Sequence, residues 1–122
     1  MCIRDSITGA DVDMAEVHDC FSVTEAQHYA ALGLCAEADA PAFIRDGAAR
    51  RDGRVPVNPS GGLLGAGHPI GATGVRQVLE SWKQATGRAG ANQLSERPRT
   101  MVTSNLGGDD RTGVVMVHRA AG

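Results

Sequence analysis

One histidine of the sequence stands in a stretch of unusually unhindered backbone. His68 lies in the glycine-rich segment NPSGGLLGAGHPIGATG, residues 58–74, with Gly67 directly before it. Glycines let backbone and substrate approach the imidazole closely, and the positive end of a helix starting just after His68 disfavours the imidazolium. A neutral imidazole is a base near pH 7. The pattern therefore favours His68 as a general base serving a group from another chain segment, over the alternative in which the glycines form a turn and His68 caps a helix.

A second group of chemically capable side chains is the tetrapeptide HDCF, residues 18–21. His18 and Cys20 follow the run DVDMAEV, which alternates apolar and polar residues and predicts a strand. A strand end is a common place for a functional side chain. However, a lone histidine is more often structural, and a cysteine beside a strand is commonly a small buried hydrophobe. The pattern by itself leaves both interpretations open for both residues.

Phosphate binding is the obvious alternative for the glycine-rich segment, and the spacing argues against it. Gly65, Gly67 and Gly71 form GxGxxxG, not the GxGxxG of dinucleotide-binding loops. A Walker loop needs Lys-Ser or Lys-Thr after its glycine, where this chain has His68-Pro69. The sequence therefore disfavours nucleotide binding.

Two helices are predicted to position these segments. Ser22 and Glu25 have capping-box spacing, so we expect a helix to begin directly after HDCF. A second helix should hold Pro69 in its first turn and end at Gly87. Its apolar residues recur at helical spacing, at Val75, Val78, Leu79 and Trp82.

Strands are expected at both ends of the chain. The C-terminal segments TMVTSNLGG and TGVVMVHRA predict a hairpin, joined by the turn Gly108-Asp109-Asp110-Arg111. Together with the strand before HDCF and the helices between, this order predicts an α/β fold in which helices cover a mixed sheet.

Composition limits the classes of function. The 122 residues suit one domain, and the formal charge of −2 argues against nucleic-acid binding. The longest apolar stretch is too short for membrane insertion. Three cysteines without CxxC pairing indicate neither a disulfide framework nor a metal site, and they fit a reducing cytoplasm. Residues 1–6, MCIRDS, belong to no pattern, and we expect them to be a non-native prefix.

The glycine-rich segment resembles the C-terminal half of the thiolases, which carries a pattern close to NxxGGxxxxGHPxGxTGxR. The matching residues are Asn58, Gly61, Gly62, Gly67, His68, Pro69, Gly71, Thr73, Gly74 and Arg76. HDCF is similar to the sterol-carrier-protein-type branch, where many other thiolases have Asn-Glu-Ala-Phe. The resemblance runs from about residue 7 to the C-terminus and implies the C-terminal half of a thiolase-like fold, with αβα layers.

The resemblance implies acyl transfer through a cysteine thioester, which needs an activated thiol, an acid/base and oxyanion donors. His68 is then expected to activate the nucleophilic cysteine and to hydrogen-bond the thioester oxygen. His18 would hold a catalytic water or the substrate carbonyl. Cys20 would move the α-proton, because Asn105 stands where most thiolases have their second cysteine.

The resemblance also implies a backbone hydrogen-bond donor and two residues of the substrate pocket. Gly107 matches the glycine whose N–H completes the second oxyanion hole. Asn58 and Gly67 are expected to line the substrate pocket. The resemblance implies coenzyme A thioesters as substrates and no permanently bound cofactor.

The thiolase nucleophile lies in the N-terminal half, and no residue here matches it. We therefore expect residues 7–122 to be an incomplete thiolase, inactive alone, whose partners are acyl-CoA and an absent N-terminal half in a homo-oligomer. The first alternative is a thiolase-like lipid-binding or complex-forming protein without turnover. The second is a ketosynthase-type condensing enzyme. It is disfavoured because Leu63 stands where ketosynthases have a lysine.

Overall fold

A three-stranded mixed sheet forms the centre of the fold. The computed structural model describes residues 7–108 and 111–121. The expected prefix and the two aspartates of the hairpin turn lie outside the described residues. Strand β1 (Met14–Val17) pairs in parallel with β2 (Thr100–Gly107), and β2 pairs antiparallel with β3 (Thr112–Arg119). The order β1-β2-β3 places β2 in the middle. The predicted hairpin and the predicted strand before HDCF are confirmed.

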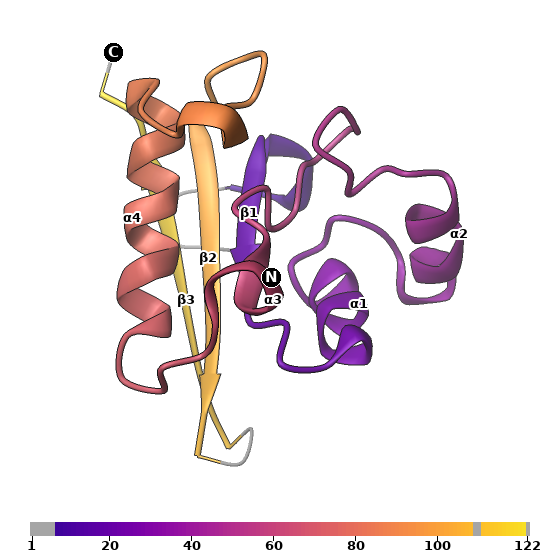
Figure 1. The fold of residues 1–122 in the computed structure, drawn as a ribbon. Helices are drawn as coiled ribbons and strands as arrows, with labels where there is room; N and C mark the ends of the chain where they lie inside the picture. The colour runs from indigo at the N-terminus through magenta and orange to yellow at the C-terminus, as the bar shows by residue number, and fades with distance from the viewer. Residues whose placement is uncertain (1–6, 109–110, 122) are drawn as a thin grey trace.

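Helices cover both faces of this sheet, as Figure 1 shows. Helix α4 (Thr73–Thr86) lies on the face of Met14 and Met101, which form a small apolar cluster with Leu94. Helices α1 (Ser22–Ala31) and α2 (Ala40–Arg45) lie on the opposite face, where Ala15 and Val17 belong to the larger core. The predicted αβα layers are thus confirmed. The short elements η1 (Gly9–Asp11), η2 (Glu37–Asp39), α3 (Gly62–Ala66) and η3 (Gly90–Asn92) connect them.

The helix predicted to begin directly after HDCF is confirmed, but its expected capping box and the expected place of Pro69 in the second helix are wrong. Ser22 is the first helical residue and Phe21 is the N-cap, so the Ser22–Glu25 capping box does not form; Glu25 instead accepts a hydrogen bond from the Tyr29 hydroxyl at 2.6 Å. Pro69 precedes α4 rather than lying in its first turn. The Pro69 carbonyl accepts hydrogen bonds from the N–H groups of residues 72 and 73, which makes a separate turn before the helix.

Helix α4 buries its polar face, whereas its apolar periodicity suggests that the apolar face is buried. The helix is confirmed and ends at Gly87 in the left-handed conformation. However, its apolar stripe, defined as Val75, Val78, Leu79 and Trp82, lines an open surface, and Val75 is 71% exposed. The buried face is polar and consists of Thr73, Gln77, Ser81 and Gln84.

Hydrogen bonds explain why a polar face is buried against the sheet. Gln77 Nε2 donates to the Ser104 carbonyl of β2 at 3.2 Å. Gln84 Nε2 donates to the Asn92 carbonyl at 2.7 Å, and Gln84 Oε1 accepts from the Leu94 N–H at 3.0 Å. A buried polar side chain is tolerated when its hydrogen bonds are made. The buried glutamines therefore act as connectors between α4 and its surroundings.

This arrangement predicts that the polar face of α4 is the more sensitive one. Gln84→Leu should lower the free energy of unfolding by about 1–3 kcal/mol, because the Leu94 N–H loses its acceptor. Leu79→Gln, on the apolar stripe, should change it by less than about 0.5 kcal/mol. Urea unfolding at low micromolar concentration, followed by Trp82 fluorescence, measures both. The reverse order of sensitivity would show that the apolar stripe faces the core.

Candidate functional site

The end of β1 and the glycine-rich segment are joined by two side-chain hydrogen bonds. Asn58 Oδ1 accepts from the Val17 N–H at 2.8 Å, although its left-handed backbone, at φ 50°, is unusual outside glycine. Asp19 Oδ1 accepts from the Leu63 N–H at 2.9 Å, in the first turn of α3. Asn58, expected to line the substrate pocket, is thus a residue that anchors the strand end.

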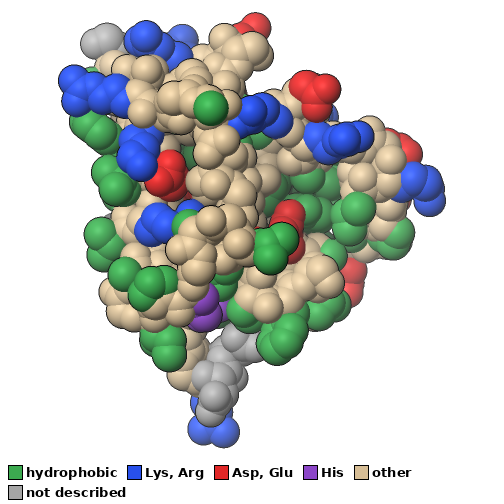
Figure 2. Space-filling view, in the orientation of Figure 1, with side chains coloured by type: hydrophobic (Ala, Val, Ile, Leu, Met, Phe, Trp, Pro, Cys, Tyr) green, Lys and Arg blue, Asp and Glu red, His purple; other side chains and the backbone are tan. Residues whose placement is uncertain are grey.

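These connections bring the two predicted histidines together. The ring centroids of His18 and His68 lie 4.8 Å apart, edge to face, with an interplanar angle of 84°. His18 follows β1 and is only 5% exposed, and its N–H donates to the Ser104 carbonyl at 2.9 Å. His68 lies between α3 and α4 and is exposed. Figure 2 shows histidine reaching the surface among hydrophobic side chains.

The hydrogen bonds of His68 determine which of its nitrogens is basic. Its Nδ1 lies 2.8 Å from Thr73 Oγ1, and the Thr73 hydroxyl donates its single proton to the Pro69 carbonyl at 3.2 Å. The hydroxyl therefore accepts from the imidazole, so Nδ1 carries the proton. Nε2 of the neutral ring is left with a free lone pair. Thr73, which belongs to the thiolase-like pattern but had no expected role, thus orients His68 with Nε2 as its basic nitrogen.

The contacts of Cys20 and Gly107 are with other residues than the two histidines. Cys20 is half-buried, with its Sγ 4.0 Å from Thr24 Oγ1 in the first turn of α1. Gly107 ends β2 opposite Thr112 in the hairpin. Gly67 ends α3 at φ 76°. At both glycines, an added Cβ would lie more than 4 Å from any described atom outside its chain neighbours, so the backbone is open to a ligand. The structure thus brings His18 and His68 together, whereas the Cys20 thiol lies against Thr24 and Gly107 pairs with Thr112.

A buried charged network supports the glycine-rich segment from behind. Ser60 donates its hydroxyl to Glu16 Oε2 at 2.8 Å and its N–H to Glu16 Oε1 at 3.2 Å. Arg76 Nη1 donates to Ser60 Oγ at 3.0 Å and lies 3.9 Å from Glu16 Oε2. Glu16 is 0% exposed. A glutamate in an otherwise apolar strand was the available sequence signal for this network.

The electrostatic balance at Glu16 favours the neutral carboxyl. Burial raises the pKa of Glu16 to about 7, while the hydrogen bonds from Ser60 and the charge of Arg76 lower it and the nearby Glu80 raises it. Desolvation therefore outweighs the stabilising contacts. Within residues 7–108 and 111–121, Arg76 Nε and Nη2 are buried without a hydrogen-bond partner, which leaves the guanidinium incompletely compensated.

The raised pKa of Glu16 predicts a pH-dependent stability. Between pH 4.5 and about 7 the unfolded chain releases a proton that the folded carboxyl keeps, so the free energy of unfolding should fall as the pH rises. The total change should be up to roughly 3 kcal/mol. Glu16→Gln should remove this component. Urea unfolding across pH 4.5–7.5 measures the difference between the two proteins, with exposed Glu96→Gln as the control that keeps the wild-type slope. Equal slopes for wild type and Glu16→Gln would contradict the assignment.

The comparisons with known proteins identify the family of the chain. Residues 3–119 match the family described as "Thiolase C-terminal domain-like". The chain therefore belongs to the thiolase C-terminal domain family. It is 41% identical over 111 residues to an acetyl-CoA acetyltransferase of Methanothermobacter thermautotrophicus, covering 91% of this chain and 29% of that protein.

Within the family, the relatives support the sterol-carrier-protein-type branch. The chain is 47% identical over 85 residues to sterol carrier protein 2 of Rattus norvegicus, covering 70% of this chain and 16% of that protein. It is 41% identical over 101 residues to benzoylsuccinyl-CoA thiolase subunit BbsB of Thauera aromatica, covering 83% and 26%. The chain thus spans less than a third of the length of these relatives.

The comparison of structures bears on the fold alone. A solved structure of an Ltp2-ChsH2(DUF35) aldolase superposes with a TM-score of 0.76 over 93% of this chain and 28% of that chain. The sequence identity is 24%. This similarity shows that the two chains share a fold, while the thiolase-like class rests on the family match.

Proposed function

We propose that this chain is the C-terminal part of a thiolase-type acyl-CoA acyltransferase. Its reaction would be thiolysis of a 3-ketoacyl-CoA or the reverse condensation of two acyl-CoA molecules. The observation that carries this proposal is the edge-to-face pair of His18 and His68, formed by segments about 50 residues apart. Membership of the thiolase family, with the HDCF and GHP segments both present, supports it.

In this proposal His68 acts first. Its Nε2 lone pair takes the proton of a cysteine thiol that lies outside this chain, and the thiolate attacks the thioester carbonyl carbon. Coenzyme A leaves as the thiol after accepting a proton, and an acyl-enzyme remains. Cys20 then moves the α-proton of the second substrate. A water molecule held by His18, together with the Gly107 N–H, stabilises the oxygen atoms that become negatively charged.

The remaining chemistry requires more protein than this chain holds. The apolar stripe of α4 is a surface that another part of the complete protein would cover, and the short coverage of the relatives supports a further half that carries the nucleophile. Coenzyme A thioesters would be substrates, with no cofactor held permanently. We also propose a homo-oligomer and a cytoplasmic location. Among the described residues, none of the helices is long and apolar enough to span a membrane.

Acyl labelling of the complete protein tests the two roles separately. His68→Ala should abolish acyl-enzyme formation from acetyl-CoA, because the nucleophile keeps its proton; the loss should be at least about 100-fold in rate. Cys20→Ala should still trap the acyl group but lose the condensation step. Mass spectrometry after brief incubation with acetyl-CoA measures labelling, and a spectrophotometric thiolysis assay measures turnover.

The second described cysteine provides the matched control. Cys35→Ala should keep both labelling and turnover, since Cys35 lines a groove beside α1 whose lining includes neither His18 nor His68. The 122-residue chain alone should remain unlabelled. Full turnover by Cys20→Ala would assign the proton shuttle to another residue, and labelling of His68→Ala at the wild-type rate would refute the base.

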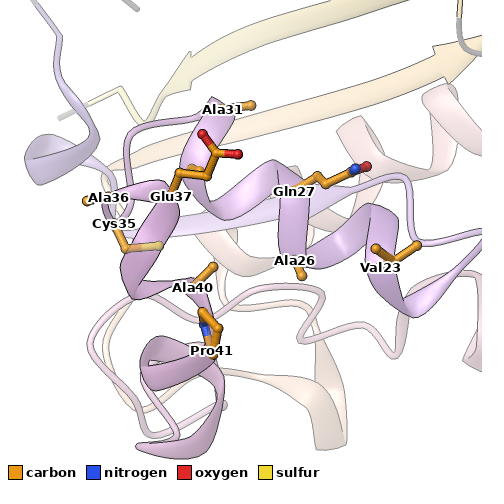
Figure 3. Close-up of a pocket in the computed structure, with 10 residues that line it drawn as sticks. Val23, Ala26, Gln27, Ala31, Cys35, Ala36, Glu37, Ala40 and Pro41 are labelled. Carbon is orange, nitrogen blue, oxygen red and sulfur yellow. The ribbon is translucent and has the colours of Figure 1, made fainter.

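A groove beside α1 favours a second candidate function, lipid binding without turnover. Figure 3 shows this groove between α1 and the segment that begins α2. It has a volume of about 640 Å³, a size common for ligand pockets. Small apolar side chains such as Ala26, Ala30 and Pro41 line it, with Gln27 and Glu37 among its polar groups. Several relatives are named sterol carrier protein 2, and one of Caenorhabditis elegans is named non-specific lipid-transfer protein-like 2.

A fluorescent fatty acid tests this second candidate. If the groove binds acyl chains, cis-parinaric acid should bind the chain saturably, and Ala30→Phe should weaken binding at least tenfold by filling the groove. Ala91→Phe, at an exposed site outside the groove, should leave the affinity unchanged. Equal affinities for all three proteins, or no saturable binding, would exclude the groove as a lipid site.

A further inference from the structure

The ring of His18 is held at one nitrogen by an amide from β2. His18 Nδ1 lies 2.8 Å from Asn105 Oδ1, and the ring is almost fully buried. A carbonyl oxygen accepts hydrogen bonds and cannot donate them, so Nδ1 carries the shared proton. When the ring is neutral, Nε2 is then an acceptor with a free lone pair.

The surroundings of Asn105 position its strand beside His18 and leave room for the amide. The preceding residue, Ser104, accepts through its carbonyl from the His18 N–H and from Gln77 Nε2, so β2 is tied both to His18 and to α4. Gly74 faces the other end of the amide: a Cβ added there would lie 3.2 Å from Asn105 Nδ2. The absence of a side chain at Gly74 leaves the room that the amide occupies.

We propose that Asn105 is a positioning residue that holds His18 as the neutral Nδ1–H tautomer and thereby presents a hydrogen-bond acceptor, Nε2, beside His68. The catalytic meaning of this inference rests on the proposed function, whereas the tautomer itself does not. An acceptor cannot donate to a substrate carbonyl. Of the two roles expected for His18, the inference therefore selects the holding of a water molecule, whose proton would in turn reach the substrate oxygen.

The chemical nature of residue 105 is what matters for the pair. A carboxylate at this position would stabilise a doubly protonated His18 by its negative charge. A positive charge on His18 would then oppose proton uptake by His68, because the two ring centroids lie 4.8 Å apart. A neutral amide orients the first ring without charging it, so His68 remains free to accept the proton of a thiol.

Imidazole ¹⁵N NMR of the histidine-labelled 122-residue chain tests the inference without substrate. At pH 8 the His18 signals, assigned through their loss in His18→Gln, should show a protonated Nδ1 and an unprotonated Nε2. Asn105→Leu, of similar size but without an acceptor, should lose this preference and give a mixture of both tautomers. Asn105→Asp should keep the proton on Nδ1 and add a proton on Nε2 at pH values where the wild-type ring is neutral.

Thr73→Val is the matched control, because it should change the tautomer signals of His68 and leave those of His18 unaltered. An Nε2–H tautomer of His18 in the wild type would overturn the inference, whether or not any variant folds. So would an unchanged tautomer in Asn105→Leu. Because no substrate is present, failure of the acyl-labelling experiment with an Nδ1–H His18 would refute the proposed reaction and leave the positioning role standing.

Discussion

The hydrogen bond from the Leu63 N–H to the Asp19 carboxylate is the contact on which the site geometry depends. It joins the first turn of α3 to the residue after His18 and so determines where the chain can place His68. Gly62 is required beside it, because its φ is 57° and an added Cβ would clash with the Asp19 carboxylate. The glycines of this segment therefore do more than admit a ligand; one of them permits the contact that aligns the two histidines.

Each of the two imidazoles has its Nδ1 hydrogen-bonded by a side chain from a different element. Thr73, at the start of α4, accepts from Nδ1 of His68, and Asn105, on β2, is the partner of Nδ1 of His18. Both partners are uncharged. A neutral pair suits rings in edge-to-face contact, because like charges at this distance repel. The ionisable side chains of this region, Glu16 and Arg76, lie behind the glycine-rich segment. Burial there raises the pKa of the Glu16 carboxyl.

Helix α4 packs its polar face against the sheet and exposes its apolar stripe. Such a helix needs a second surface if its apolar stripe is to be buried, and residues 7–108 and 111–121 leave that stripe exposed. Amphipathic periodicity therefore shows which apolar residues share a helix face. It does not show whether the sheet or another part of the protein packs against that face. The same helix begins beside His68, so its packing and the site are coupled.

The sequence by itself determined the strands, the C-terminal helix with its stop at Gly87, the layered α/β class and the two histidine-bearing segments. Each of these follows from local periodicity, from turn residues or from a motif of short span. Only the tertiary structure decided which face of α4 is buried, where α4 begins, and which groups hold the rings. The reason is physical: the bond between His18 and Asn105 joins residues 87 positions apart, and no local pattern encodes a hydrogen bond whose geometry arises from the pairing of two strands.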